Sequence, residues 1–222
     1  MKYSYSRMAT YKQCPAKFKY HYIEKPDVAD LPSSPNMERG TRIHDSVEAF
    51  FNRTNEMLHP DIHADYGQFL NSIREEGHTV IPEYKWGITW EFEKCDYDAP
   101  DVMVRGFVDL LVLPENKDEI LIYEWKTGKK YPEHTAQAWL YGVAMMCHFP
   151  EYKQAQTYLT YFDQKDFVCV AYPRAMMFEY KPKLRREISM IADDEQYIPK
   201  PSFKCRWCKY SSRNNSGPCR VG

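Results

Sequence analysis

Apolar and polar residues repeat with two different periods along the chain, and the period predicts the type of each element. Helical spacing of three or four predicts helices, with a second stretch starting at Pro15, at residues 4–23, 37–53, 64–77, 132–149 and 183–191. Runs of β-branched and apolar residues predict strands at residues 102–113, 119–127, 158–162 and 167–172. The proline-rich residues 26–36 predict a loop. This order of helices and strands indicates a mixed α/β domain.

The composition of the 222-residue chain is that of a folded protein. A hydrophobic content of 43% with 15% aromatic residues excludes an intrinsically disordered chain. No run approaches the ~18 consecutive apolar residues of a membrane span. The first residues contain no apolar core of a signal peptide, so we expect a cytoplasmic protein in a reducing compartment, without structural disulfides.

Charge is unevenly distributed, although 30 basic and 31 acidic residues give a net charge of −1. Residues 1–26 carry +5, residues 27–180 carry −12, and residues 181–222 carry +6. The near-neutral total excludes a simple basic DNA-coating protein and an acidic tail protein. Two interpretations of the basic ends remain: solvated helix faces that arise by chance, or one basic patch formed where the two ends meet.

Two carboxylates and a lysine stand in or beside the predicted strand pair. Asp109 interrupts an apolar strand, and Glu124 and Lys126 share one face of the next strand. If the strands form a hairpin, Asp109 approaches Glu124, and two carboxylates repel each other unless a cation lies between them. Oxygen ligands suit Mg²⁺ or Mn²⁺, and a nearby lysine can orient a water for phosphodiester hydrolysis. The alternative is that each carboxylate merely caps a strand end at the surface.

Four short motifs in one order carry a family resemblance: Gly40-x3-His44, Gly106-x2-Asp109, Glu124-x-Lys126 and Gln137-x3-Tyr141. In these motifs the sequence resembles the PD-(D/E)XK nuclease superfamily. It is most similar to the RecB-like branch, which includes the AddB nuclease domain, CRISPR-associated exonucleases and phage recombination exonucleases. The resemblance extends from about residue 4 to residue 219. It implies a restriction-endonuclease-like α/β core, in which helices flank a mixed central sheet.

The resemblance also assigns roles to residues. Asp109, Glu124 and Lys126 would be catalytic, and the metal ligands would be His44, Asp109, Glu124 and the Trp125 carbonyl. DNA would be held by Gln137, Tyr141, Arg42, Lys129 and Lys130. Glu83 or Glu91, upstream of the first predicted strand, would add a further acidic group. The alternatives are that His44 is a hydrogen-bonded core residue, as a lone inward histidine usually is, and that Gln137 and Tyr141 are the polar flank of an amphipathic helix.

Seven cysteines complete the candidate chemistry. Cys205 and Cys208 form a C-x2-C pair with Cys219 eleven residues further on, which indicates a metal site. A fourth ligand must come from elsewhere in the chain, and Cys14 is the candidate. The resemblance implies a 4Fe–4S cluster bound by these four cysteines. The ten residues between Cys208 and Cys219 exceed the family's usual gap, so structural Zn²⁺ with four thiolates, or a cluster with another ligand, remains an alternative. We expect the three other cysteines to be small buried apolar residues: Cys95, Cys147 and Cys169.

Together these features predict a single nuclease domain over residues 1–222. Residues 1–26 and 181–222 would form a cysteine-ligated, cluster-binding cap, and residues 37–180 the catalytic core. The predicted activity is that of a metal-dependent DNA exonuclease acting on single-stranded or duplex ends, in a prokaryote or a phage-infected cell. The alternatives are an endonuclease or flap nuclease with the same metal site, and a non-catalytic iron–sulfur or zinc DNA-binding module. The sequence does not define a protein partner or a homo-oligomer.

Overall fold

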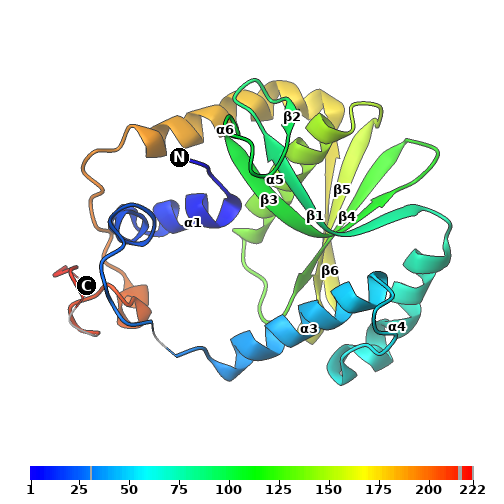
Figure 1. The fold of residues 1–222 in the computed structure, drawn as a ribbon, viewed down its shortest axis with the longest axis horizontal. Helices are drawn as coiled ribbons and strands as arrows, with labels where there is room; N and C mark the ends of the chain where they lie inside the picture. Colours follow the sequence, from blue (N-terminus) through cyan, green and yellow to red (C-terminus); the bar gives the residue numbers. More distant parts are fainter. Residues whose placement is uncertain (31, 215–216, 222) are drawn as a thin grey trace. The chain divides into compact units, whose positions relative to one another are not determined.

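A six-stranded mixed sheet forms the centre of the fold in the computed structural model, which describes residues 1–30, 32–214 and 217–221 (Figure 1). The strand order is β2-β1-β3-β4-β5-β6. The strands are β1 (Thr79–Ile88), β2 (Lys94–Cys95), β3 (Val104–Leu113), β4 (Glu119–Lys126), β5 (Gln154–Tyr161) and β6 (Asp166–Pro173). Neighbours are antiparallel except β4 and β5, which are parallel and joined by the crossover helix α5 (His134–His148). The predicted α/β class is confirmed.

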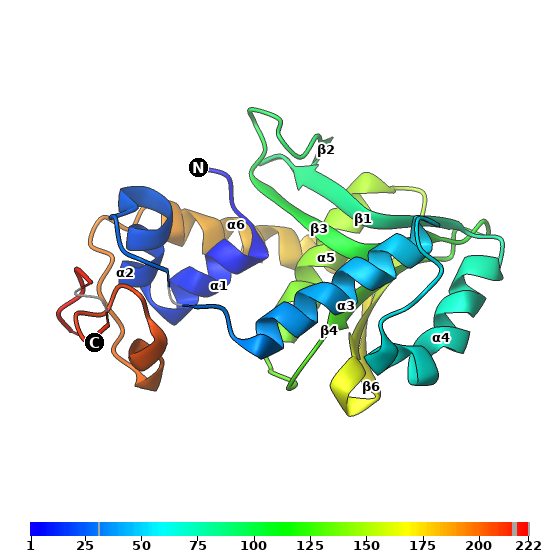
Figure 2. The same cartoon turned by 60° about the horizontal axis from the view of Figure 1, so that its bottom comes forward.

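Helices α3 (Pro35–Phe51) and α4 (Pro60–Glu75) cover one face of the sheet (Figure 2). Their apolar side chains form one cluster with Leu110 of β3 and with Tyr123 and Trp125 of β4. Ser34 caps the start of α3, because its side chain accepts the N–H of Met37 at 3.3 Å. The apolar face of α3 packs against strands β3 and β4.

Helix α5 lies against the opposite face and is buried on most of its surface. Gly142 allows close packing, because a Cβ there would lie 2.7 Å from the Tyr172 side chain of β6. Trp139 stacks on Tyr180 at the start of helix α6 (Met177–Ala192), with ring centroids 5.5 Å apart. The sheet is therefore flanked by helices on both faces.

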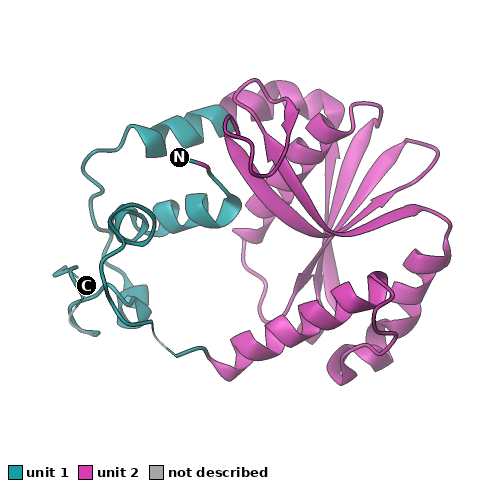
Figure 3. Cartoon of the chain, viewed as in Figure 1, with its two compact units in different colours: residues 1, 3–33, 184–222 teal, residues 2, 34–183 magenta. Residues whose placement is uncertain are grey.

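The chain divides into two compact units (Figure 3). One, the sheet unit, contains residues 34–183. The other contains residues 3–33 and the chain from Leu184 onward, and we call it the cysteine unit because Cys14, Cys205, Cys208 and Cys219 belong to it. Helix α6 begins in the sheet unit and ends in the cysteine unit.

The named elements of the cysteine unit are all helices. Its elements are α1 (Tyr5–Gln13), α2 (Pro15–Phe18), the π-helix η1 (Lys19–Glu24), the second half of α6, and the 3-10 helix η4 (Phe203–Trp207). The extended backbone of Cys14 interrupts the first helical stretch, and Pro15 begins the next, as predicted. Tyr11 donates from its hydroxyl to Asp194 at 2.6 Å, which ties α1 to the segment after α6.

Several boundaries differ from the sequence prediction. Strand β1 was not predicted, α4 begins four residues early behind the cap His59, and α6 begins at Met177 because it accommodates Pro182 in its interior. Two short 3-10 turns, η2 (Phe162–Gln164) and η3 (Arg174–Met176), follow β5 and β6. Within the residues that the model describes, no helix combines the length and apolar content that a membrane crossing requires.

Candidate active site

Asp109 and Glu124 lie where strands β3 and β4 stop pairing. The last pair on that side is Leu110 with Tyr123, so the next residue of each strand is Asp109 or Glu124. In place of a further backbone pair, the Oδ2 atom of Asp109 accepts the backbone N–H of Trp125 at 2.7 Å. Asp109 of β3 therefore joins the two strands just beyond their last backbone pair, and its carboxylate lies beside β4.

Glu124 is buried, with 6% of its surface exposed. Its Oε1 atom accepts two hydrogen bonds, from Lys126 Nζ and from Gln137 Nε2, each at 2.8 Å. Its Oε2 atom is buried without a hydrogen-bond partner among the described residues. Burial and, to a smaller extent, the Asp109 carboxylate raise the pKa of Glu124 and Lys126 opposes both, so that the pKa lies at about 7. The unpartnered oxygen marks a place where a positive group would be stabilised.

Lys126, Gln137 and Tyr141 form one buried network around Glu124. Lys126 Nζ donates to Gln137 Oε1 at 2.8 Å, and Gln137 Nε2 donates to the Tyr141 hydroxyl at 2.7 Å. Gln137 and Tyr141 are only 7% and 6% exposed. In the structure Gln137 contacts Glu124 and Lys126 of β4, and Tyr141 contacts Gln137. The DNA contact predicted for Gln137 and Tyr141 stays a prediction.

His44 reaches the site from α3, with its Nδ1 atom 3.5 Å from Asp109 Oδ2. Burial lowers the pKa of His44, but the adjacent Asp109 carboxylate outweighs it, and the pKa lies above the ordinary histidine value. His44 of α3, Asp109 of β3 and Glu124 of β4 thus lie together where the pairing of β3 with β4 ends.

Glu83 adds a third carboxyl group. Its neighbours on β1 pair with the neighbours of Asp109 on β3, so Glu83 lies opposite Asp109, and its φ of 46° interrupts the ladder there. Burial, together with the charges of Asp109 and Glu48, raises the pKa of Glu83 to about 7. The sequence placed Glu83 upstream of the first strand, whereas it lies within β1. Glu91 is exposed in the turn after β1, and its backbone N–H contacts Thr89.

The turn that follows Lys126 is held from two sides. A Cβ on Gly40 would lie 2.8 Å from Thr127 Oγ1, so the glycine allows α3 to approach this turn. Asp163 accepts the backbone N–H of Gly128 at 2.9 Å with one oxygen and a bond from Arg39 at 2.8 Å with the other. No sequence signal pointed to Arg39 or Asp163, because their link joins residues 124 positions apart.

We compared the sequence of the chain with models of known protein families. The family model for the PD-(D/E)XK nuclease superfamily matches residues 2–213, nearly the whole chain. The chain belongs to the PD-(D/E)XK nuclease superfamily. Membership implies phosphodiester hydrolysis and a nucleic-acid substrate, and proteins of this superfamily usually use divalent metal ions. The mixed sheet flanked by helices is consistent with a restriction-endonuclease-like core.

One similar solved structure is described as "Crystal structure of SSO0001". It is 12% identical in sequence, with 99% of this chain and 85% of that chain covered and a TM-score of 0.46. No curated protein matches the chain.

The residues of this PD-(D/E)XK protein fit a divalent cation in their chemistry. Across the described ranges, no three His, Cys, Asp or Glu side chains are already spaced as ligands of one ion. At the carboxylate site, Glu124 Oε1 is held by Lys126 and Gln137, and His44 is paired with Asp109. The buried, unpartnered Oε2 of Glu124 beside a second carboxylate is nevertheless the donor set that a hard cation prefers.

The three predicted phosphate contacts differ in their surroundings. Arg42 on α3 and Lys129 after Gly128 have exposed side chains. Lys130 instead forms an ion pair with Asp166, and its Nζ lies 5.3 Å from the centre of the Tyr161 ring. Arg42 and Lys129 are therefore the more accessible of the three to a phosphate.

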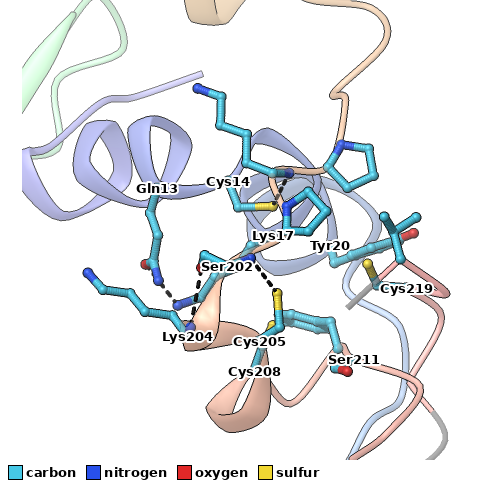
Figure 4. Close-up of a pocket in the computed structure, with 15 residues that line it drawn as sticks. Gln13, Cys14, Lys17, Tyr20, Ser202, Lys204, Cys205, Cys208, Ser211 and Cys219 are labelled. Carbon is cyan, nitrogen blue, oxygen red and sulfur yellow. Dashed lines mark hydrogen bonds between the residues drawn. The ribbon is translucent and has the colours of Figure 1, made fainter.

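The four cysteines of the cysteine unit line one cavity (Figure 4). Cys14 comes from the break between α1 and α2, Cys205 from η4, Cys208 from the residue after η4, and Cys219 from the tail. The thiols of Cys14 and Cys205 accept backbone N–H groups, from Lys200 at 3.4 Å and from Ser202 at 3.3 Å. These side chains lie around a common space from segments nearly 200 residues apart.

The backbone around the C-x2-C pair is fixed by Asn214. Its Nδ2 atom donates to the carbonyls of Cys205, Arg206 and Cys208 at 2.9 to 3.2 Å. The tail returns beside this turn, because the N–H of Cys219 donates to Tyr210 at 2.8 Å. A short, well-hydrogen-bonded turn therefore presents two of the thiols.

The remaining cysteines lie in the sheet unit, in β2, α5 and β6. Cys95 and Cys147 are partly buried, but Cys169 is exposed on the edge strand β6 and donates to Gln156 Oε1 at 3.4 Å. The expectation of a buried apolar residue is wrong for Cys169, because β6 has no neighbour on its outer side in the strand order.

Proposed function

We propose that the chain is a metal-dependent DNA exonuclease that hydrolyses phosphodiester bonds at DNA ends during processing or recombination. The observation that carries the proposal is the unpartnered, buried Oε2 of Glu124, next to Asp109 and on the strand that carries Lys126. Leaving a buried carboxylate oxygen without a partner is costly, and a site that must receive a cation is a reason to retain it. The exonuclease mode rests on the resemblance of the four motifs to those of RecB-like exonucleases.

The proposed ligands of a Mg²⁺ or Mn²⁺ ion are Asp109, Glu124, His44 and the Trp125 carbonyl. When bound, the ion supplies a Lewis acid for the phosphate oxygens and lowers the pKa of a water. An imidazole ligand shifts the preference from Mg²⁺ towards Mn²⁺. Glu83, opposite Asp109, adds a carboxyl group to the same acidic surface.

Lys126 acts on the attacking water and on the charge that develops at the phosphate. Its amine is held between Glu124 Oε1 and Gln137 Oε1, each 2.8 Å away. Gln137 fixes the position of that amine, because its amide is in turn bound to Tyr141. Gln137 and Tyr141 are thus proposed to position the catalytic pair as well as to contact DNA, and Arg42, Lys129 and Lys130 to contact phosphates.

The four-cysteine cavity supports placement in the RecB-like, AddB-like branch with a 4Fe–4S cluster, or with structural Zn²⁺ as the alternative. Four thiols around one space suit either group. Backbone N–H groups already directed at two of the sulfurs would stabilise the thiolate charge. In this proposal residues 1–26 and 181–222 form a cap that binds the cluster, and residues 37–180 form the catalytic core.

Cleavage of end-labelled DNA tests the function. Linear single-stranded and duplex DNA, closed circular DNA and a labelled RNA strand are incubated with the full chain and Mn²⁺ or Mg²⁺, and with EDTA as the metal-free control. We expect shortening of linear DNA from an end, no cutting of closed circles, and no reaction in EDTA. Cutting of closed circles would identify the endonuclease alternative, and DNA binding without cleavage under either metal the non-catalytic module.

Single substitutions test the assigned roles. Asp109→Ala, Glu124→Ala and Lys126→Ala should each lower cleavage by at least about a hundredfold while the far-ultraviolet circular dichroism is retained. Lys153→Ala is the matched control. Lys153 is an exposed lysine paired with Asp118, which precedes β4 at the end opposite to Glu124 and Lys126. Digestion by Lys126→Ala at the rate of Lys153→Ala would overturn the mechanism.

A further inference from the structure

The last part of the cysteine unit carries positive charge only. Residues 196–222 contain no aspartate or glutamate and six basic residues: Lys200, Lys204, Arg206, Lys209, Arg213 and Arg220. Lys209 is paired with Asp30 at 2.5 Å. Within residues 1–30, 32–214 and 217–221, the other five are exposed and form no ion pair with an acidic side chain. This segment therefore presents positive charge to solvent that an anionic partner would balance.

Two large aromatic rings of the helix η4 stand in this basic segment. Phe203 is 69% exposed and Trp207 is 58% exposed. Their ring centroids lie 6.1 Å apart, with the ring planes at 86° to each other. Single exposed apolar side chains are common, but two neighbouring rings leave a continuous apolar surface open to solvent. Such a surface suits a partner that itself contains flat rings.

A cation lies on the same surface. The Arg206 Cζ atom is 3.8 Å from the centre of the Trp207 ring and 6.0 Å from that of Phe203. A guanidinium stacked on a ring keeps N–H groups at its edge for a phosphate. The backbone here is fixed, because Asn214 Nδ2 donates to the Arg206 carbonyl at 2.9 Å and Ser202 caps the start of η4. Rings and cation are therefore arranged before a partner binds.

A nucleic acid satisfies both features of this surface. Its phosphates complement the basic segment, and its bases provide flat rings that stack on aromatic side chains. The chain also belongs to a superfamily whose substrate is a nucleic acid. In an intact duplex the neighbouring bases cover each face of a base, so only an unpaired base can stack on Phe203 or Trp207.

From these observations we infer that Phe203, Lys204, Arg206 and Trp207, which we call the η4 surface, bind an unpaired segment of a DNA strand. The inference rests on the proposed function and gives the substrate a second contact besides the active site. A base stacks on the rings, and Arg206 and Lys204 bind the flanking phosphates. The contact does not depend on base identity, because every base has a flat face.

Binding of the full chain to single-stranded DNA in EDTA tests this inference without cleavage. The probe is a fluorescent oligothymidylate of about ten nucleotides, followed by anisotropy. Trp207→Ala should weaken binding at least about fivefold and leave the salt dependence unchanged. Arg206→Ala should also weaken binding and lower the slope of log affinity against log salt by about 1. Phe178→Ala, at a residue of the sheet unit that is 86% exposed, is the control and should bind like the wild type.

Two variants that keep a large apolar side chain separate stacking from folding. Trp207→Phe retains a flat ring and should keep most of the affinity, whereas Trp207→Leu should bind as weakly as Trp207→Ala. Far-ultraviolet circular dichroism checks the fold of each variant. Equal affinity of Trp207→Ala and wild type, or of Trp207→Leu and Trp207→Phe, would overturn the inference.

Two further probes test the kind of partner. A blunt hairpin duplex should bind more weakly than the single strand, and Trp207→Ala should not change its binding; the same loss on both probes would contradict an unpaired base. Sedimentation with vesicles of phosphatidylserine and phosphatidylcholine tests an anionic lipid surface. Vesicle binding that falls in Trp207→Ala while DNA binding stays unchanged would overturn the inference.

Cleavage of linear DNA separates this inference from the proposed function. If the wild type cleaves linear DNA but Trp207→Ala binds single strands like the wild type, only the η4 surface fails. If the wild type neither binds nor cleaves DNA, the proposed function fails with it.

Discussion

Gln137 donates to the same oxygen of Glu124 that Lys126 holds, and this leaves the other oxygen of that carboxylate free. One amide from the crossover helix α5 thus determines which face of the acidic group remains available. Glu124 and Lys126 are successive residues on one face of β4, but their relative position depends on a third residue, Gln137, that follows in the chain.

Gln137→Ala is expected to lower the free energy of unfolding by about 1–3 kcal/mol, because it leaves the Tyr141 hydroxyl and one bond of Lys126 without their partner. Urea unfolding measures the change. Gln196→Ala, a substitution of an exposed glutamine, serves as the control and should be neutral. Equal stability of the two variants would show that the network around Glu124 contributes nothing to the fold.

The buried imidazole of His148 should make the free energy of unfolding depend on pH. Burial lowers the pKa of His148, whose ring lies between the Tyr84 hydroxyl at 2.9 Å and the Gly87 carbonyl at 2.7 Å. The unfolded chain therefore takes up the proton first as the pH falls below about 6.5, and the wild type loses stability there. His148→Gln should be less stable than wild type at pH 8, and the gap should narrow towards pH 5.

The exposed His63 provides the control for that measurement. His63→Gln should run parallel to the wild type at every pH in urea titrations. A gap between wild type and His148→Gln that stays constant from pH 8 to pH 5 would contradict the assignment of a buried neutral imidazole.

Gly106 and Gly67 predict opposite effects of the same substitution. A Cβ on Gly106 would lie 2.7 Å from the Trp86 ring, whereas a Cβ on Gly67 would meet its nearest atoms at 3.9 Å. Gly106→Ala should destabilise the protein by about 1–3 kcal/mol through overpacking. Gly67→Ala should stabilise it by up to about 1 kcal/mol, because alanine is the better helix former in α4. Thermal unfolding of both variants checks the sign of each change.

The four-cysteine cavity predicts a bound metal in the purified protein. Anaerobically prepared wild type should contain either about four iron atoms or one zinc ion per chain by elemental analysis. Cys205→Ser should lose most of that metal and unfold more easily, because the group would join segments distant in sequence. Cys169→Ser, at an exposed cysteine outside the cavity, should retain it. A fully folded wild type with neither metal would exclude the cluster.

Pattern and spacing predicted the elements with strong periodicity. The apolar runs of β3 and β4 and the helical stripe of α5 lie within a few residues of their predicted bounds. Strand β1 escaped prediction because Pro82, Glu83 and Gly87 break its alternation, and only pairing with β3 makes it a strand. The sequence of a single segment does not show which strand it will pair with.

The residues of the candidate site likewise fall into those that have a local sequence signal and those that have none. The carboxylates and Lys126 are recognisable because charges in apolar strands are unusual, and the structure places them beside one another. The roles of Arg39 and Asp163 have no such local signature, since they arise only when α3 and the β5–β6 turn approach the same loop. Burial of Gln137 and Tyr141 was likewise invisible, because helical spacing defines a face but not its neighbour.

The hairpin turns β3–β4 and β5–β6 of the sheet unit differ in how freely their length can change during evolution. Residues 115–118 between β3 and β4 are exposed, so an insertion there lengthens a surface loop. The turn between β5 and β6 carries Asp163, which holds Arg39 of α3 and Gly128 after β4 at once. Extra residues beside Asp163 would shift the loop next to Lys126. Natural length variation should therefore accumulate in the first turn, while the second should keep its length wherever Asp163 is retained.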